Sequence, residues 1–160
     1  MDVIFETEQI SESASVDFGS REAIKFGAEA VLRLPIDLPL ITAEDIETIL
    51  AADQSNPWAN PSVVIVPSRD GTGTNAILRR PPTLFPSHFG AGSLAKHLRE
   101  AKQANAACQL LQLPNIALDI DEPADLAELL GRGQGNAISQ LLAEMNVAER
   151  LKRFWETRPS

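Results

Sequence analysis

The sequence predicts an α/β protein in which a mostly parallel, mixed sheet is covered by helices on both faces, so that three layers form. Mostly apolar runs at residues 30–34 and 63–67 are typical of strands that are buried on both faces. Both runs end at a proline, Pro35 or Pro67, and polar residues follow. Segments with helical spacing alternate with the strands, which is the pattern of helices packed on a mostly parallel sheet.

The composition indicates one ordinary globular domain over residues 1–160. The chain is 44% hydrophobic and 22% charged, and it is long enough to bury a substantial core. A net charge of −8 argues against a general nucleic-acid binder, because phosphate contacts need lysine and arginine. The sequence lacks an apolar run of about 18 residues and a signal peptide, so we expect no membrane association and a cytoplasmic location. Cys108 is the single cysteine, and its apolar neighbours predict a buried, inert thiol.

The elements follow from local patterns. Short apolar runs predict the strands, and a glycine that ends residues 20–27 predicts a short helix there. Thr42 is expected to cap the next helix, with Asp45 in the capping-box position. A proline in the first turn, Pro123, starts a later helix. The predicted strands are residues 3–5, 30–34, 63–67, 76–79, 109–113 and 116–119. The predicted helices are residues 20–27, 43–52, 94–105, 124–130, 136–144 and 147–155.

Three aspartates follow predicted strands. Asp37 lies just after the strand that ends at Pro35, and Asp119 and Asp121 follow the strand at 116–119. Ligands of open α/β sheets bind at the carboxyl ends of the strands. Crowded carboxylates repel one another, and a bound Mg²⁺ would relieve the repulsion and hold phosphate oxygens. The alternative is that Asp37 only shapes a turn and that the other two cap the following helix.

Two glycine-containing loops offer free backbone amides. Residues 71–75 suit phosphate or carboxylate oxygens, although a simple hairpin turn is the alternative. Residues 90–93 precede a helix, where free N–H groups and the helix dipole favour anions. The alternative there is an ordinary N-cap by Ser93. The two loops and the aspartates together indicate a small phosphorylated acid held by amides and metal.

Four motifs in one order resemble the 2-phospho-L-lactate guanylyltransferase family. They are LPIDLPL with Asp37, SRDGTGTNAIL at 68–78, FGAGSLAKHLREA at 89–101 and LDIDEPADLAELL at 118–130. The resemblance implies a Rossmann-like, three-layer α/β/α nucleotidyltransferase fold, with residues 136–155 as a C-terminal helical extension. Members make the GTP-activated intermediate of the deazaflavin coenzyme F-420.

The resemblance also assigns residues. It implies that Asp37, Asp119 and Asp121 hold Mg²⁺, with Asp37 catalytic, and that Thr74, Gly90 and Ser93 bind the phospho-acid. The acid would be 2-phospho-L-lactate, phosphoenolpyruvate or 3-phosphoglycerate, and its phosphate would attack the α-phosphorus of GTP and release pyrophosphate. Pairing of two copies through the C-terminal helices and hand-over of the product to the downstream phospholactate transferase are further expectations.

The chain departs from the family pattern at its beginning. The match starts at the family's second strand, without the first strand and the lysine- and arginine-bearing loop that hold the triphosphate, so we expect an N-terminally short domain. In place of the family's Gly-Gly-Leu-Asn stretch, Ser15 and Asp17 are the expected nucleotide-binding residues. The rival hypothesis is a non-catalytic remnant that binds a phospho-acid or a partner protein. A sugar-nucleotide transferase is a third option.

Overall fold

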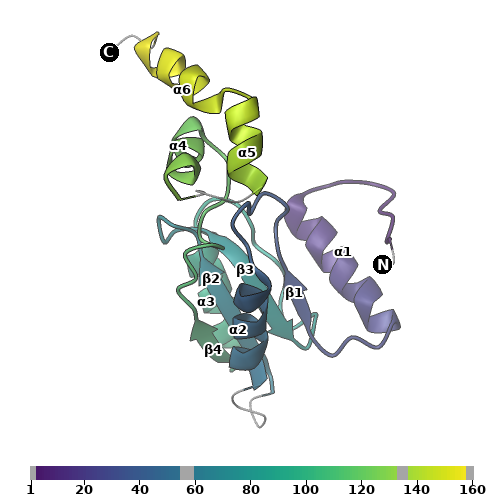
Figure 1. The fold of residues 1–160 in the computed structure, drawn as a ribbon. Coiled ribbons are helices and arrows are strands. Elements are labelled where there is room, and N and C mark those ends of the chain that lie inside the picture. Colours follow the sequence, from purple (N-terminus) through teal and green to yellow (C-terminus); the bar gives the residue numbers. More distant parts are fainter. Residues whose placement is uncertain (1–2, 55–59, 133–136, 158–160) are drawn as a thin grey trace.

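A computed structural model describes residues 3–54, 60–132 and 137–157. Within those residues, four strands form one sheet in the order β1-β3-β2-β4 (Figure 1). The strands are β1 (Val31–Arg33), β2 (Ser62–Pro67), β3 (Thr74–Arg80) and β4 (Ala107–Leu110), and the helices are α1 (Glu12–Lys25), α2 (Ala43–Gln54), α3 (Ser93–Gln103), α4 (Pro123–Arg132), α5 (Ala137–Glu144) and α6 (Val147–Glu156).

The sheet is mixed, as expected, but its pairing is not mostly parallel. Strand β3 runs antiparallel to both β1 and β2, and the parallel pair in this sheet is β2 with β4. The reason is the short connection at 68–73, which turns the chain back on itself and makes β2 and β3 a hairpin. The sequence had left a hairpin and two separated strands as alternatives for this pair.

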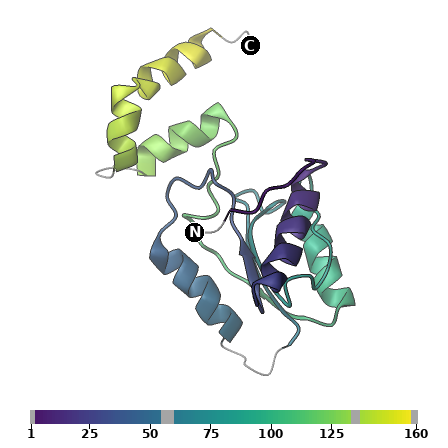
Figure 2. The same ribbon diagram turned by 90° about the vertical axis from the view of Figure 1, so that its right-hand side faces the viewer.

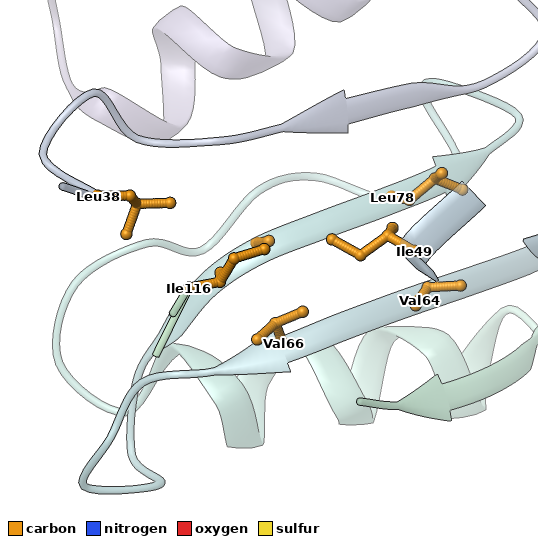
Figure 3. Packing of buried hydrophobic residues seen from close by; sticks show 7 residues of the cluster. Leu38, Ile49, Val64, Val66, Leu78 and Ile116 are labelled. Atoms are coloured by element: carbon orange, nitrogen blue, oxygen red, sulfur yellow. The ribbon is translucent and has the colours of Figure 1, made fainter. Parts of the chain in front are cut away.

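Helices cover both faces of the sheet, which confirms the three layers (Figure 2). On one face, Val64, Val66 and Leu78 pack against Ile49 of α2 (Figure 3). Residues of opposite parity, Val63, Ile65 and Ile77, pack with Ala101 of α3 on the other face. Successive side chains of a strand point to opposite faces of the sheet, so apolar residues at every position let these strands pack against helices on both faces.

Helix α1 is longer than predicted and lies on the same side of the sheet as α3 (Figure 2). Ser11 caps it by accepting the N–H of Ala14 at 3.1 Å, so the helix begins at Glu12 within a segment whose polar composition had concealed it. The predicted strand at 3–5 is wrong. Phe5 is 83% exposed and has no strand to pair with in the described structure.

Helix α2 starts with the predicted capping box. The Thr42 N–H donates to Asp45 Oδ2 at 2.9 Å, and the Asp45 N–H donates to Thr42 Oγ1 at 3.2 Å. Both bonds satisfy donors that a helix start leaves unpaired. The buried side chain of Leu38, just before this cap, anchors the turn that carries Asp37.

The last two predicted strands require correction. β4 lies at Ala107–Leu110 rather than at 109–113, and Cys108 on this edge strand is exposed rather than buried. Residues 116–119 form no strand. Their carbonyls bond instead to the Asn75 side chain, which reaches Ile116 O at 2.9 Å, and to the Arg69 N–H, which reaches Ala117 O at 3.0 Å.

Helices α4, α5 and α6 form a group at one end of the sheet (Figure 1). Leu129, Leu142 and Val147 from these helices pack with Leu118 in a separate apolar cluster. The predicted extension covers α5 and α6, although its first residue, Asn136, lies outside the described residues. In the described part of the chain, every helix is too short or too polar to cross a membrane.

Candidate functional site

A pocket of about 680 Å³ opens at one edge of the sheet. Five segments far apart in the sequence line it: the start of α1 at Glu12, the end of β1 with its following turn, the β2–β3 hairpin loop, the residues before α3, and the segment that leads into α4. All six residues predicted for the metal and the phospho-acid line this pocket, namely Asp37, Thr74, Gly90, Ser93, Asp119 and Asp121.

The three aspartates form the acidic side of the pocket. Asp119 is the main cause of a raised pKa at Asp121, followed by burial and then by the charge of Asp37. Within the described residues, no hydrogen bond to the Asp121 carboxylate supports the alternative that it caps α4. The bonds at the helix start go to Asp125, the third residue of α4, whose Oδ2 accepts the N–H groups of Asp121 at 3.1 Å and Glu122 at 2.8 Å. The Asp121 carboxylate therefore remains available to a ligand.

The acidic side fits a divalent cation only in part. Among the described residues, no three histidine, cysteine, aspartate or glutamate side chains are close enough to form a ready metal cluster. Mg²⁺ usually takes one or two protein carboxylates and completes its shell with phosphate oxygens and water. The repulsion between Asp119 and Asp121 is the imbalance that such an ion would relieve. Binding of Mg²⁺ by these aspartates and Asp37 stays a prediction.

The hairpin loop is held rigid by its own side chains. Asp70 accepts hydrogen bonds from Ser68 Oγ at 2.6 Å and from the N–H and Oγ1 of Thr72 at 2.9 and 2.7 Å, and these bonds hold its pKa well below the usual range. Ser68 Oγ also accepts the Gly73 N–H at 2.7 Å, and a Cβ at Gly73 would meet that oxygen at 2.8 Å. The loop is both the expected hairpin turn and a wall of the pocket.

The turn at 90–93 places a helix start beside that loop. Gly90 and Gly92 have φ values of 95° and 67°, in the left-handed region that favours glycine. Gly92 is the N-cap of α3, so the alternative that Ser93 is the cap is wrong. The Leu94 N–H donates to Thr72 O at 3.1 Å and fastens the helix start to the hairpin. The Ser93 N–H is bonded to Gly90 O at 3.1 Å, so these two amides of the first turn are used within the chain, and the helix dipole is what favours an anion at this side of the pocket.

Thr74 has a buried hydrogen-bonding partner, His97, that the sequence prediction missed. His97 of α3 is completely buried, and its Nδ1 lies 3.0 Å from Thr74 Oγ1. Its Nε2 accepts the backbone N–H of His88 at 3.0 Å. Burial lowers the pKa of His97 to about 4, so the ring is neutral at pH 7.

Arg33 is a pocket residue that the sequence prediction missed. Its guanidinium lies 4.2 Å from the centre of the Phe89 ring, donates to Asn75 O at 3.3 Å and pairs with Glu12. It brings a positive charge to a wall that is otherwise mostly acidic or neutral. A charged residue inside the apolar run at 30–34 was the available signal, because an unpaired arginine is costly in a buried strand.

The two residues predicted to bind the nucleotide do not line the pocket. Asp17 accepts the N–H and Oγ of Ser87, at 3.1 and 2.6 Å, and an Arg79 Nη1 hydrogen at 3.3 Å. Ser15 donates to Glu6 at 2.6 Å. Both side chains have partners within the chain, and their role toward the nucleotide stays a prediction.

Comparison with solved structures confirms the fold. A nucleotide-diphospho-sugar transferase from Desulfovibrio desulfuricans G20 superposes with a TM-score of 0.66 over 92% of this chain and 64% of the other, at 18% sequence identity. The open mixed sheet with helices on both faces is therefore an α/β nucleotidyltransferase fold.

Comparison with curated sequences identifies relatives. A phosphoenolpyruvate guanylyltransferase from Rubrobacter xylanophilus is 40% identical over 76% of this chain and 57% of its own length. A 3-phospho-D-glycerate guanylyltransferase from Colwellia psychrerythraea is 34% identical over 80% of this chain and 58% of its own length. A 2-phospho-L-lactate guanylyltransferase from Methanoregula boonei is 36% identical over 72% of this chain and 50% of its own length.

The chain spans about half the length of these curated relatives. The family model described as "Guanylyl transferase CofC like" matches residues 7–158, which include all five pocket-lining segments. The chain therefore belongs to the CofC-like guanylyl transferase family.

Proposed function

We propose that the protein transfers GMP from GTP to a small phosphorylated carboxylic acid and releases pyrophosphate. The observation that carries the proposal is the gathering of five separate segments around one pocket, which bring carboxylates together with hydroxyl- and amide-bearing loops. The relatives are named for phosphoenolpyruvate, 3-phospho-D-glycerate and 2-phospho-L-lactate. These acids share a three-carbon skeleton with one carboxylate and one phosphate, which is the substrate class we propose.

In the proposed reaction, an oxygen of the acid's phosphate forms a bond to the α-phosphorus of GTP. The bond between that phosphorus and the oxygen that bridges to the β-phosphate breaks, and the electron pair leaves with pyrophosphate. Thr74 and Ser93 would orient the acid by donating hydrogen bonds from their hydroxyls, and Gly90 by donating from its backbone amide. Positioning and charge stabilisation are most of what a protein contributes to such a transfer.

Asp37, Asp119 and Asp121 would hold Mg²⁺ in this proposal. When bound, the ion would neutralise charge between the two anions that must approach each other. The raised pKa of Asp121 supports this role, because its main cause is the negative charge of Asp119, which a bound cation would offset. Arg69, the closest arginine in sequence to the hairpin tip, is already bonded to Asp125 at 2.7 Å and to Glu128.

Ser15 and Asp17 remain the proposed residues of the nucleotide side. Because Asp17 bonds to the segment before Phe89, its effect on GTP would be exerted through the position of α1. The place of the reaction in coenzyme F-420 synthesis, the hand-over to a phospholactate transferase, the pairing of two copies and the cytoplasmic location belong to the same proposal and derive from the family resemblance.

One observation favours the rival, a non-catalytic protein that binds a phospho-acid or a partner protein. Among the described residues that line the pocket, the arginines and lysines are Arg33 and Arg69, and both are paired with carboxylates. A triphosphate needs more positive charge than these two provide. Titration calorimetry separates the hypotheses: binding of phosphoenolpyruvate without any binding of GTP and Mg²⁺ would favour the rival.

The direct test is GTP-dependent pyrophosphate release in the presence of Mg²⁺ and each of the three acids in turn. We expect release with at least one acid and none without acid. Absence of release with every acid, from protein that binds both GTP and acid, would contradict the proposed transfer.

A further inference from the structure

His97 and Thr74 form a buried pair at the floor of the pocket. Thr74 begins β3 and lines the pocket, whereas His97 lies on the inner side of α3 and is completely buried. Three rings, those of Phe85, His88 and Phe89, surround the imidazole with centroid distances of 6.2, 6.2 and 5.1 Å. The imidazole therefore has a fixed orientation and reaches the substrate only through Thr74.

The hydrogen bonds of His97 determine its tautomer. A backbone N–H can only donate, so the bond from His88 N at 3.0 Å requires that Nε2 carries no hydrogen. A neutral imidazole has one hydrogen, which must then be on Nδ1. Nδ1 therefore donates to Thr74 Oγ1 across their 3.0 Å separation. The lowered pKa of His97 agrees with a neutral ring.

This donor fixes the role of the Thr74 hydroxyl. Its oxygen accepts from His97, and within the described residues the Thr74 side chain makes no other hydrogen bond. The hydroxyl hydrogen is thus available to donate to a ligand in the pocket that Thr74 lines. A phosphate or carboxylate oxygen only accepts hydrogen bonds, so it complements a hydroxyl held in this state.

We propose that His97 is a positioning residue that holds the Thr74 hydroxyl as a hydrogen-bond donor to an oxygen of the anionic substrate. The proposal rests on the proposed function, because it assigns the phospho-acid to the Thr74 side of the pocket. It adds His97, which does not touch the substrate. By donating to the Thr74 hydroxyl, His97 makes that hydroxyl a donor toward the substrate. The same oxygen chemistry would admit inorganic phosphate, which serves as a second probe.

The first test is the tautomer in the absence of any ligand. Long-range ¹H–¹⁵N spectra of the imidazoles at pH 7 should show His97 protonated on Nδ1 and bare on Nε2. The chain has two histidines, so a His88→Gln variant identifies the His97 signals. An Nε2–H tautomer or an imidazolium would overturn the inference whether or not the protein is an enzyme.

The second test uses two amides that each imitate one ring nitrogen. In His97→Asn the amide can take the place of Nδ1 and still donate to Thr74. In His97→Gln the amide oxygen takes the place of Nε2, so it accepts from His88 N but leaves Thr74 without a donor. We expect His97→Gln to weaken phosphoenolpyruvate binding by about tenfold and His97→Asn to weaken it by less than about threefold, with inorganic phosphate following the same order.

A double-mutant cycle with Thr74→Val shows whether His97 acts through Thr74. Once the hydroxyl is removed, His97→Gln should cause no further loss of affinity. Equal losses in the two His97 variants, or additive losses in the cycle, would overturn the inference and leave His97 a packing residue. If the wild-type protein binds neither phosphoenolpyruvate nor phosphate, the proposed function and the donor role of Thr74 both fail, and the spectra alone decide the His97 geometry.

Discussion

At the scale of one residue, Asp121 carries the negative charge that the proposed cation would offset. Its backbone N–H is bonded to Asp125, which leaves its own carboxylate beside Asp119 and within the field of Asp37. The charge of Asp119 raises the pKa of Asp121, and a bound divalent ion would reverse this effect.

We predict that Asp37→Asn or Asp121→Asn lowers GMP transfer by about 100-fold or more while the fold persists, because an amide removes the negative charge without changing the size of the side chain. The measurement is pyrophosphate release with circular dichroism as the check on folding. Glu47→Gln is the matched control, since this exposed acid lies on α2 and outside the pocket lining. Full activity in Asp37→Asn would remove Asp37 from the proposed metal site.

A second prediction concerns His97 and the pH dependence of stability. Its pKa is 6.5 in the reference state and about 4 in the fold, so between these values the unfolded chain binds the proton more readily. The free energy of unfolding should therefore decrease as pH falls from about 6.5 to about 4, by up to about 3 kcal/mol from this group, and should not change through His97 above pH 6.5.

Urea unfolding of wild type and His97→Asn at several pH values isolates that contribution. The carboxylates titrate in both proteins, so the stability difference between them should shrink as the pH is lowered. A difference that stays constant from pH 7 to pH 4 would show that His97 does not titrate in this way.

At the scale of elements, α1 is attached to the sheet by a polar network. Arg79 is 2% exposed and bonds to Asp17, to Ser20 Oγ at 3.1 Å and to Phe85 O at 2.5 Å. Asp17 in turn holds the backbone N–H of Ser87. The network therefore ties α1, β3 and the segment that leads to the 90–93 turn into one unit.

We predict that Asp17→Ala destabilises the protein by about 3 kcal/mol, because the Arg79 charge would then be buried without its partner. Ser15→Ala on the same helix is the control and should cost less than about 1 kcal/mol, since it removes one partly exposed hydrogen bond. Urea unfolding measures both variants. Equal small effects would mean that Asp17 does not stabilise the attachment of α1.

Two glycines allow a test of backbone conformation. Gly19 lies within α1, and a methyl group added there would meet no heavy atom within 4 Å, so Gly19→Ala should stabilise the protein by up to about 1 kcal/mol through helix propensity. Gly92 has a φ of 67°, so Gly92→Ala should destabilise it by about 1–2 kcal/mol. Thermal unfolding measures both changes. If both substitutions shifted the unfolding temperature equally and in the same direction, the result would contradict the left-handed conformation of Gly92.

The same elements show how far the sequence could be used for prediction. The central strands and α2 follow from uniformly apolar runs and a capping box, and these signals are local. The segment at 116–119 has strand-like composition, but its carbonyls bond to Asn75 and Arg69 from other parts of the chain. Composition could not reveal that these bonds replace strand pairing at 116–119. It also could not reveal that most of the sheet is antiparallel, because this depends on whether the six-residue loop at 68–73 closes a hairpin.

For the candidate site, the sequence could predict most of the residues that line the pocket but not those that position them. The residues that line the pocket could be named from motif order, because each motif carries its own strand end or glycine turn. Arg33 and His97 were missed because their roles depend on partners, Phe89 and Thr74, that lie far away in sequence. Residues whose function is to orient another residue have no local sequence signal.

For the whole molecule, the main electrostatic problem of the proposed reaction is that a chain of net charge −8 would have to bind two anions. The segment that carries Asp119 and Asp121 links the sheet to the α4–α6 group and places these two aspartates at the pocket (Figure 1).

If a divalent ion inverts the charge at these aspartates, the affinity for the phospho-acid should depend on the ion. We predict that removing Mg²⁺ with a chelator weakens phosphoenolpyruvate binding by at least about tenfold. Calorimetry with and without Mg²⁺ measures this change in affinity. Unchanged affinity would show that binding of the acid does not depend on an ion held by the aspartates.

The central claim is that this pocket joins GMP to a phosphorylated three-carbon acid. The most direct measurement is ³¹P nuclear magnetic resonance of GTP, Mg²⁺ and phosphoenolpyruvate with the protein. The account predicts two new coupled phosphoanhydride signals, from the joined α-phosphorus and the acid's phosphorus, together with an equal amount of pyrophosphate. A spectrum in which GTP and the acid persist unchanged while both are bound would contradict it.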